Sequence, residues 1–102
     1  MQLYVIGDYF TVNTFKLIGI DGQVFEADAD YGNILNTIEN LIKKEEIGMI
    51  IYNSFIREIV GQKFDDYLKR AKPVFFEIPD TDSEFKEENL QEFIQKVIGI
   101  KI

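Results

Sequence analysis

Short, mainly apolar runs recur along this chain, and each run stops at a turn-forming or polar residue. They occupy residues 3–6, 48–53 and 74–78. An apolar run of this length bounded by turn signals predicts a strand that is covered on both faces of a sheet. A further strand is predicted over residues 23–27, where the charged Glu26 suits an edge position.

Between these runs, apolar residues recur at three- and four-residue spacing, which predicts amphipathic helices. The predicted helices cover residues 11–18, 31–45 and 54–69, and the last one runs from about residue 90 to residue 98. The helix over residues 54–69 carries an unusually broad apolar stripe.

The alternation of strand and helix favours an α/β domain with a parallel sheet. Right-handed crossovers and a strand order of 2-1-3-4 place the first helix on one face and the second and third on the other. The fourth helix then returns to the first face. The sequence thus predicts a single flavodoxin-like (CheY-like) three-layer sandwich with a four-stranded parallel sheet and four helices. The domain spans residues 1–102, with a strand–helix core at about 1–79 and an acidic loop and C-terminal helix at about 80–102.

The composition is that of one globular domain, with 102 residues of which 46% are hydrophobic. No apolar run approaches the roughly 20 residues that a membrane helix needs, so we expect no direct membrane insertion and no signal peptide. The formal net charge is −7, and no basic stripe is evident along the sequence. This charge argues against nucleic acid or anionic lipid as a partner and favours an apolar or basic partner surface.

In a fold of this kind the natural site is the crevice where the strand order reverses. Here the crevice would lie between Gly7-Asp8 and Asn53-Ser54. Response-regulator receivers phosphorylate an aspartate at the end of their third strand, whereas this chain has Asn53 there and offers only Asp8 as a carboxylate. We therefore interpret Asp8 and Ser54 as helix caps.

Other kinds of chemistry find little support in the sequence. The chain has no His and no Cys, and only one glycine follows the first strand, so a catalytic triad and a phosphate-binding loop are both excluded. Residues 80–84 begin like a calcium loop, but Phe85 and Gln91 stand where that loop needs Gly and Glu. We expect no catalytic residue, no cofactor and no metal site, which is typical of a binding module.

Four segments, read together and in order, carry a recognisable combination. They are Val5-Ile6-Gly7-Asp8 with Thr11-Val12 and Phe15-Lys16-Leu17, then Glu46-Ile47-Gly48-Met49-Ile50-Ile51, then Lys72-Pro73-Val74 with Glu77-Ile78-Pro79, and finally Val97-Ile98-Gly99-Ile100-Lys101-Ile102. This combination resembles the F subunit of the archaeal and bacterial A/V-type rotary ATPases, over the whole length of the chain. Thr14, Lys16 and Ile18 depart from that family's usual Gly, Arg and Ala.

The resemblance implies a non-catalytic component of the central stalk, or rotor, that binds the coiled-coil D subunit. Through the D subunit it would be linked to the catalytic A/B hexamer and the membrane ring, and would help couple ATP turnover to proton or sodium transport. It would lie on the cytoplasmic side of the membrane as a peripheral part of the complex. A receiver-like signalling adaptor that cannot be phosphorylated is the alternative.

Two regions are candidates for the partner interface. On the third predicted helix, Phe55 and Tyr67 either face outward or complete the core, because the apolar stripe is wider than a sheet covers. The C-terminal segment is the other candidate. Its interface residues are Phe93, Val97, Ile100, Lys101 and Ile102. The two isoleucines need a burial site, which either the partner or the chain's own sheet beside the first helix provides.

Overall fold

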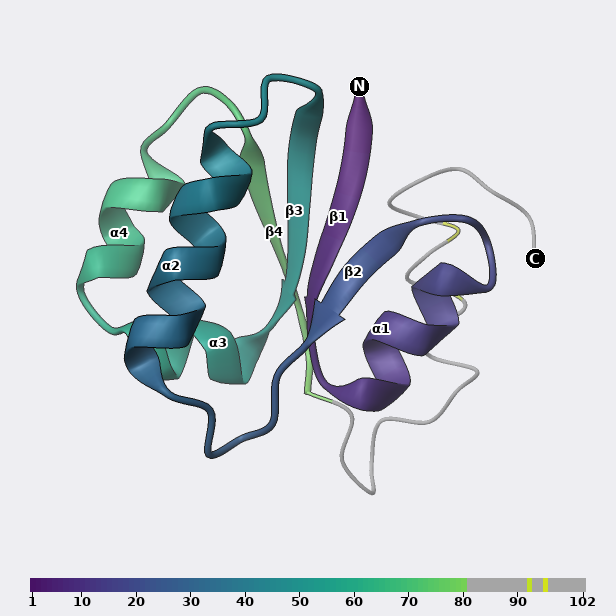
Figure 1. Ribbon diagram of the computed structural model, residues 1–102, viewed down its shortest axis with the longest axis horizontal. Coiled ribbons are helices and arrows are strands. Elements are labelled where there is room, and N and C mark those ends of the chain that lie inside the picture. The colour runs from purple at the N-terminus through teal and green to yellow at the C-terminus, as the bar shows by residue number, and fades with distance from the viewer. Residues whose placement is uncertain (81–91, 93–94, 96–102) are drawn as a thin grey trace.

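The computed structural model describes residues 1–80, 92 and 95, and their arrangement is a three-layer sandwich (Figure 1). The elements follow in the order β1 (Gln2–Gly7), α1 (Tyr9–Lys16), β2 (Asp21–Val24), α2 (Tyr31–Ile42), β3 (Ile47–Asn53), α3 (Ser54–Val60), α4 (Lys63–Leu68) and β4 (Val74–Ile78). The last predicted helix, at about residues 90–98, lies largely outside the described residues.

The four strands form one parallel sheet in the order β2-β1-β3-β4, which confirms the predicted topology. β1 lies inside the sheet, where Val5 pairs with Gly22 of β2 on one side and with Ile51 of β3 on the other. β2 and β4 are the two edge strands. The strand order reverses between β1 and β3, so the carboxyl ends of these two strands define the switch point of the fold.

Each face of the sheet carries its own hydrophobic cluster. The larger cluster packs α2, α3 and α4 against one face and centres on fully buried side chains such as Ile34, Ile38 and Phe64. The smaller cluster packs α1 against the opposite face through Val12 and Phe15. Figure 1 shows these helices on the two sides of the sheet, as the sequence predicts for the first three helices.

The boundaries of the first elements differ from the prediction for reasons of hydrogen bonding. α1 begins at Tyr9 instead of residue 11, because the Asp8 side chain accepts a hydrogen bond from the Thr11 backbone N–H and so caps the helix from one residue before it. β2 begins at Asp21 and ends at Val24, whereas the sequence predicts residues 23–27. Phe25 donates a last backbone hydrogen bond to Gly7, and the chain then leaves the sheet, since Gly7 is itself the end of β1.

The predicted helix over residues 54–69 is two helices. Gly61 adopts a positive φ of 73°, a conformation that favours glycine, and it separates α3 from α4. The break redirects the chain so that Phe64 and Tyr67 of α4 and Val60 of α3 all reach the same core. α2 is also shorter than predicted and ends at Ile42 instead of residue 45.

In the part of the chain that the structure describes, no helix has both the length and the apolar character needed to cross a membrane.

Candidate functional site

The switch point brings together the residues that the sequence places there. The backbone N–H of Asp8 donates to Asn53 Oδ1 at 2.8 Å, although the two residues are 45 positions apart. The Asp8 carboxylate caps α1, as predicted. The ends of β1 and β3 are therefore joined by a side chain of the protein itself.

Asn53 fills the crevice. Its side chain is fully buried, with no exposed area, and its Nδ2 donates to Thr11 Oγ1 at 3.1 Å and to the Pro79 carbonyl at 2.9 Å. A Cβ atom on Gly7 would lie only 1.8 Å from Asn53 Oδ1, so the residue facing Asn53 has to be glycine. The amide thus ties β1, α1 and the end of β4 together, and it occupies the space in which this fold commonly holds a ligand.

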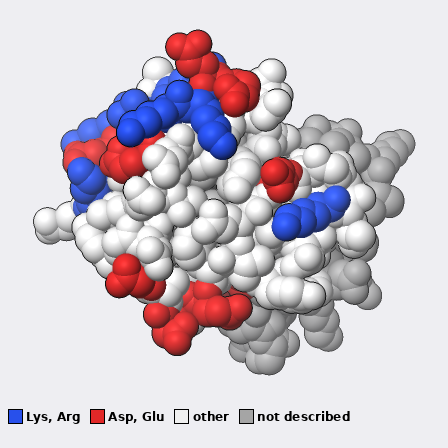
Figure 2. All heavy atoms as spheres, in the orientation of Figure 1, with Lys and Arg blue, Asp and Glu red and all other residues white. Residues whose placement is uncertain are grey.

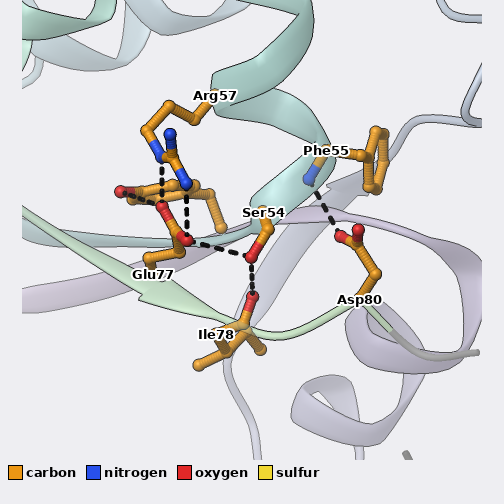
Figure 3. A network of polar contacts seen from close by, with 7 residues as sticks. Ser54, Phe55, Arg57, Glu77, Ile78 and Asp80 are labelled. Atoms are coloured by element: carbon orange, nitrogen blue, oxygen red, sulfur yellow. Dashed lines mark hydrogen bonds and ion pairs between the residues drawn. The ribbon is translucent and has the colours of Figure 1, made fainter. Parts of the chain in front are cut away.

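A second polar network joins the end of β4 to the start of α3 (Figure 3). Glu77 receives two hydrogen bonds from Arg57, from Nε to Oε1 at 2.6 Å and from Nη2 to Oε2 at 3.1 Å. Tyr52 and Ser54 also donate their hydroxyl groups to the Glu77 carboxylate, at 3.1 and 2.9 Å. These four donors fasten the edge strand β4 to the helix that follows β3.

The predicted capping role of Ser54 is wrong. The side chain of Ser54 turns to Glu77 on β4, and Asn53, which precedes the helix, makes no capping hydrogen bond with its side chain. Asp80 acts in their place: its Oδ1 accepts from the backbone N–H of Phe55 at 2.9 Å (Figure 3). A carboxylate from the end of β4 therefore satisfies a free N–H group of the first turn of α3.

The protonation of these groups follows their partners. The two hydrogen bonds from Arg57 lower the pKa of Glu77, and this effect exceeds the opposing effect of partial burial. Burial raises the pKa of Tyr52, and the neighbouring Glu77 carboxylate raises it further. Glu77 therefore remains an ionised acceptor and Tyr52 a neutral donor, which suits a structural network better than acid–base chemistry.

Tyr67 does not face outward in the structure. Its side chain is only 3% exposed, stacks on Phe75 with ring centroids 5.6 Å apart and donates its hydroxyl to Glu39 at 2.8 Å. Burial, followed by the bond to Glu39, raises the pKa of Tyr67. The broad stripe is explained by an aromatic cluster of Tyr52, Phe64, Tyr67 and Phe75 beneath α4.

The other candidate interface residues have different outcomes. Phe55 is half-buried at the margin of the larger cluster, so part of its ring remains accessible. The remaining five, which are Phe93, Val97, Ile100, Lys101 and Ile102, lie outside the described residues. Three exposed apolar side chains on or just after α1, namely Tyr9, Phe10 and Leu17, are not among the sequence-based candidates.

Metal binding finds no support in the described part of the chain. No group of three or more carboxylates there is arranged to hold a metal ion. Of the calcium-like stretch at residues 80–84, only Asp80 is described, and its carboxylate accepts from the backbone of α3.

We predict that the chain does not bind nucleotide tightly, because Asn53 occupies the switch point and a single glycine follows β1. Isothermal titration with ATP and Mg²⁺ should give an affinity no stronger than about −4 kcal/mol, which corresponds to about 1 mM. A dissociation constant in the micromolar range would contradict this prediction.

The fold and the filled switch point define the class of the protein: a small α/β domain of flavodoxin-like topology whose usual ligand crevice is closed by its own asparagine. The sequence profile of the family described as "ATP synthase (F/14-kDa) subunit" matches residues 3–98. The chain belongs to this family.

Individual relatives agree with the family assignment. The chain is 29% identical to the A-type ATP synthase F subunit of Thermococcus kodakarensis over 106 aligned residues, which cover 100% of this chain and 98% of the relative. It is 32% identical to the V-type proton ATPase F subunit of Rattus norvegicus over 87 residues, covering 76% of this chain and 72% of the relative. The corresponding V-type proton ATPase protein of Homo sapiens is 31% identical over the same coverage.

Proposed function

We propose that this chain is a non-catalytic central-stalk component of an A/V-type ATPase or ATP synthase. In this role it binds the coiled-coil D subunit, and through it the A/B catalytic hexamer and the membrane ring. It helps couple ATP turnover to proton or sodium transport. The chain lies on the cytoplasmic side of the membrane as a peripheral part of the complex.

The observation that carries this proposal is the filled switch point. In an α/β sheet of this topology a ligand or a reacting group is expected at that place. Here the fully buried Asn53 spends its amide on Asp8, Thr11 and Pro79. A domain that closes its own crevice in this way is suited to rigid protein–protein contact, and membership of the ATP synthase F family supports the same role.

Co-elution with the cognate D subunit tests the proposal. When the purified chain is mixed with the D subunit at equal concentration, size-exclusion chromatography should show both proteins in one earlier peak. Two separate peaks at concentrations of about 10 μM or more would count heavily against a central-stalk role, because stable protein complexes have dissociation constants below that value.

The C-terminal residues are the proposed docking element, together with the accessible part of Phe55. A variant that ends at Gly99 lacks Ile100, Lys101 and Ile102, and it should bind the D subunit about tenfold or more weakly, since burial of each isoleucine is worth about 1.5–3 kcal/mol. Its melting temperature should barely change. A fall in melting temperature with unchanged affinity would instead place these residues in the domain's own core.

The rival function is that of a receiver-like signalling adaptor. We predict that acetyl phosphate does not modify the chain, because Asn53 replaces the reactive aspartate and Asp8 is engaged as the cap of α1. Intact-mass spectrometry after incubation should show an unchanged mass. Addition of one phosphoryl group to Asp8 or a neighbouring residue would revive the signalling function.

A further inference from the structure

The fold gathers positive charge at one end of an acidic protein. Five cations, which we call the basic pole, lie in the two loops that lead into β3 and β4: Lys43, Lys44, Lys69, Arg70 and Lys72. Only eight lysines and arginines occur among the described residues, so more than half of them lie in these two loops. Figure 2 shows the blue side chains concentrated at the upper left, where Figure 1 places the ends of α2 and α4.

The two loops are neighbours in space although they are about 25 residues apart in the sequence. Met49 of β3 pairs with Val74 of β4, so the amino ends of both strands lie side by side. The Nζ of Lys72 donates to the backbone carbonyl of Glu45 at 2.6 Å, which joins one loop directly to the other. This explains why no basic stripe is visible in the linear sequence.

The charges of the basic pole are not neutralised by other described residues. All five side chains are exposed, and none of them forms an ion pair within residues 1–80. Two carboxylates, Glu45 and Glu46, lie in the same loop, so the surface keeps a positive excess. Cations near the carboxyl ends of helices stabilise those helices, which accounts for Lys43 and Lys69, the residues that end α2 and α4. The same effect does not account for Lys72, which follows no helix directly.

Two large apolar side chains border the basic pole and are unusually exposed. Leu68, the last residue of α4, is 46% exposed, and Val74, the first residue of β4, is 47% exposed. They flank the stretch that carries Lys69, Arg70 and Lys72 in the α4–β4 loop. Apolar side chains ringed by charges are typical of a protein–protein contact, in which the apolar centre is buried and the charged rim aligns the partners.

We propose that the basic pole, with Leu68 and Val74, is a second docking surface for a protein of the same rotary complex. The matching surface would present carboxylates around an apolar centre. A protein fits better than a lipid headgroup layer or a nucleic acid, because Glu45 and Glu46 would meet a uniformly anionic surface with like charge and the whole chain carries a net charge of −7. The surface lies at the opposite end of the sheet from the switch point and Asn53. The inference rests on the proposed function only in naming the complex to which the partner belongs.

Charge reversal tests the proposal. The double variant Lys69→Glu/Arg70→Glu is compared with Lys16→Glu/Lys63→Glu, which makes the same change in net charge at two exposed lysines outside the basic pole. Both variants and the wild-type chain are titrated against the cognate ATPase complex purified without this protein. We expect Lys69→Glu/Arg70→Glu to bind about tenfold more weakly than wild type at about 50 mM salt, and the control to stay within about threefold. The difference should shrink at about 500 mM salt, where charge interactions are screened.

Each other outcome overturns the proposal. Equal affinity of the two double variants would remove the docking surface and leave the central-stalk function intact, whereas no binding by the wild-type chain would overturn both. Binding of the wild-type chain, and not of Lys69→Glu/Arg70→Glu, to phosphatidylserine vesicles would assign the basic pole to a membrane surface. Loss of wild-type self-association in that variant, measured by sedimentation equilibrium, would assign it to contact between copies.

Discussion

Tyr67→Ala should lower the free energy of unfolding by about 3–5 kcal/mol, the loss that is usual when a buried aromatic residue is removed. The side chain is 3% exposed, stacks on Phe75 and packs against Phe64, and its hydroxyl is bonded to Glu39. Removing the ring leaves a cavity beneath α4 and removes the hydrogen-bond donor of Glu39. Urea denaturation, analysed by linear extrapolation, measures the loss.

Phe55→Ala is the matched comparison, because Phe55 is half-buried and makes no ring contact with the cluster of Tyr52, Phe64, Tyr67 and Phe75. Its loss of stability should be about 1–2 kcal/mol, in proportion to its smaller buried area. Tyr67→Phe keeps the ring and should cost only about 1 kcal/mol, so a folded variant exists even where Tyr67→Ala is largely unfolded. Equal losses for Phe55→Ala and Tyr67→Ala would contradict the assignment of Tyr67 to the core.

Gly7→Ala should destabilise the protein by about 3 kcal/mol, at the upper end of the range for overpacked cores. The added methyl group would lie 1.8 Å from Asn53 Oδ1 and 2.8 Å from its Cγ, so the amide has to move. Moving it breaks the hydrogen bonds to the backbone of Asp8 and Pro79. Gly32→Ala is the control, since its new methyl group would meet only a side-chain oxygen of Asp30 at 3.1 Å.

A double-mutant cycle separates this clash from a general effect at the switch point. Asn53→Ala alone should cost about 3 kcal/mol, because it leaves the Asp8 N–H and the Pro79 carbonyl without their partner. On that background the atoms that meet the new methyl group are gone, and only the Asn53 Cβ at an ordinary 3.5 Å remains. Gly7→Ala/Asn53→Ala should therefore be about as stable as Asn53→Ala. Additive losses, measured by the same denaturation, would show that the two residues act independently.

The topology could be predicted because the apolar runs are unambiguous. β3 and β4 are apolar nearly throughout, β1 ends at a Gly-Asp turn, and one-sided helices lie between them, so only the crossover rule was needed to order the strands. β2 was misplaced because its sequence, Asp21-Gly22-Gln23-Val24, has weak strand character. Its position is set by pairing with Tyr4 to Gly7 of β1, which is tertiary information.

The break between α3 and α4 has a local signal that the apolar periodicity conceals. Gly61 is the only glycine within residues 54–69, and the spacing of Ile56, Val60 and Phe64 continues across it as though one helix were present. A glycine in such a stretch is compatible with either one helix or two. The positive φ at Gly61 follows from the need to bury Phe64 and Tyr67 against β4, which depends on the complete fold.

The contents of the candidate site could be predicted only in part. The meeting of Asp8 with Asn53 follows from the strand order, because both residues stand at the carboxyl ends of neighbouring strands. The partners that β4 contributes, namely Glu77, Pro79 and Asp80, lie 23 to 26 positions from the groups that they contact. Their one sequence signal is that Glu77 interrupts an apolar strand, and a lone charge in an edge strand is also expected for other reasons.

A structure of the intact cognate complex, determined by single-particle electron microscopy, tests the central claim most directly. The account predicts the four-stranded domain on the central stalk in contact with the coiled coil of the D subunit, with the C-terminal residues of this chain at that contact. Density for the domain on a peripheral part of the complex, or a complete complex without it, would contradict the account.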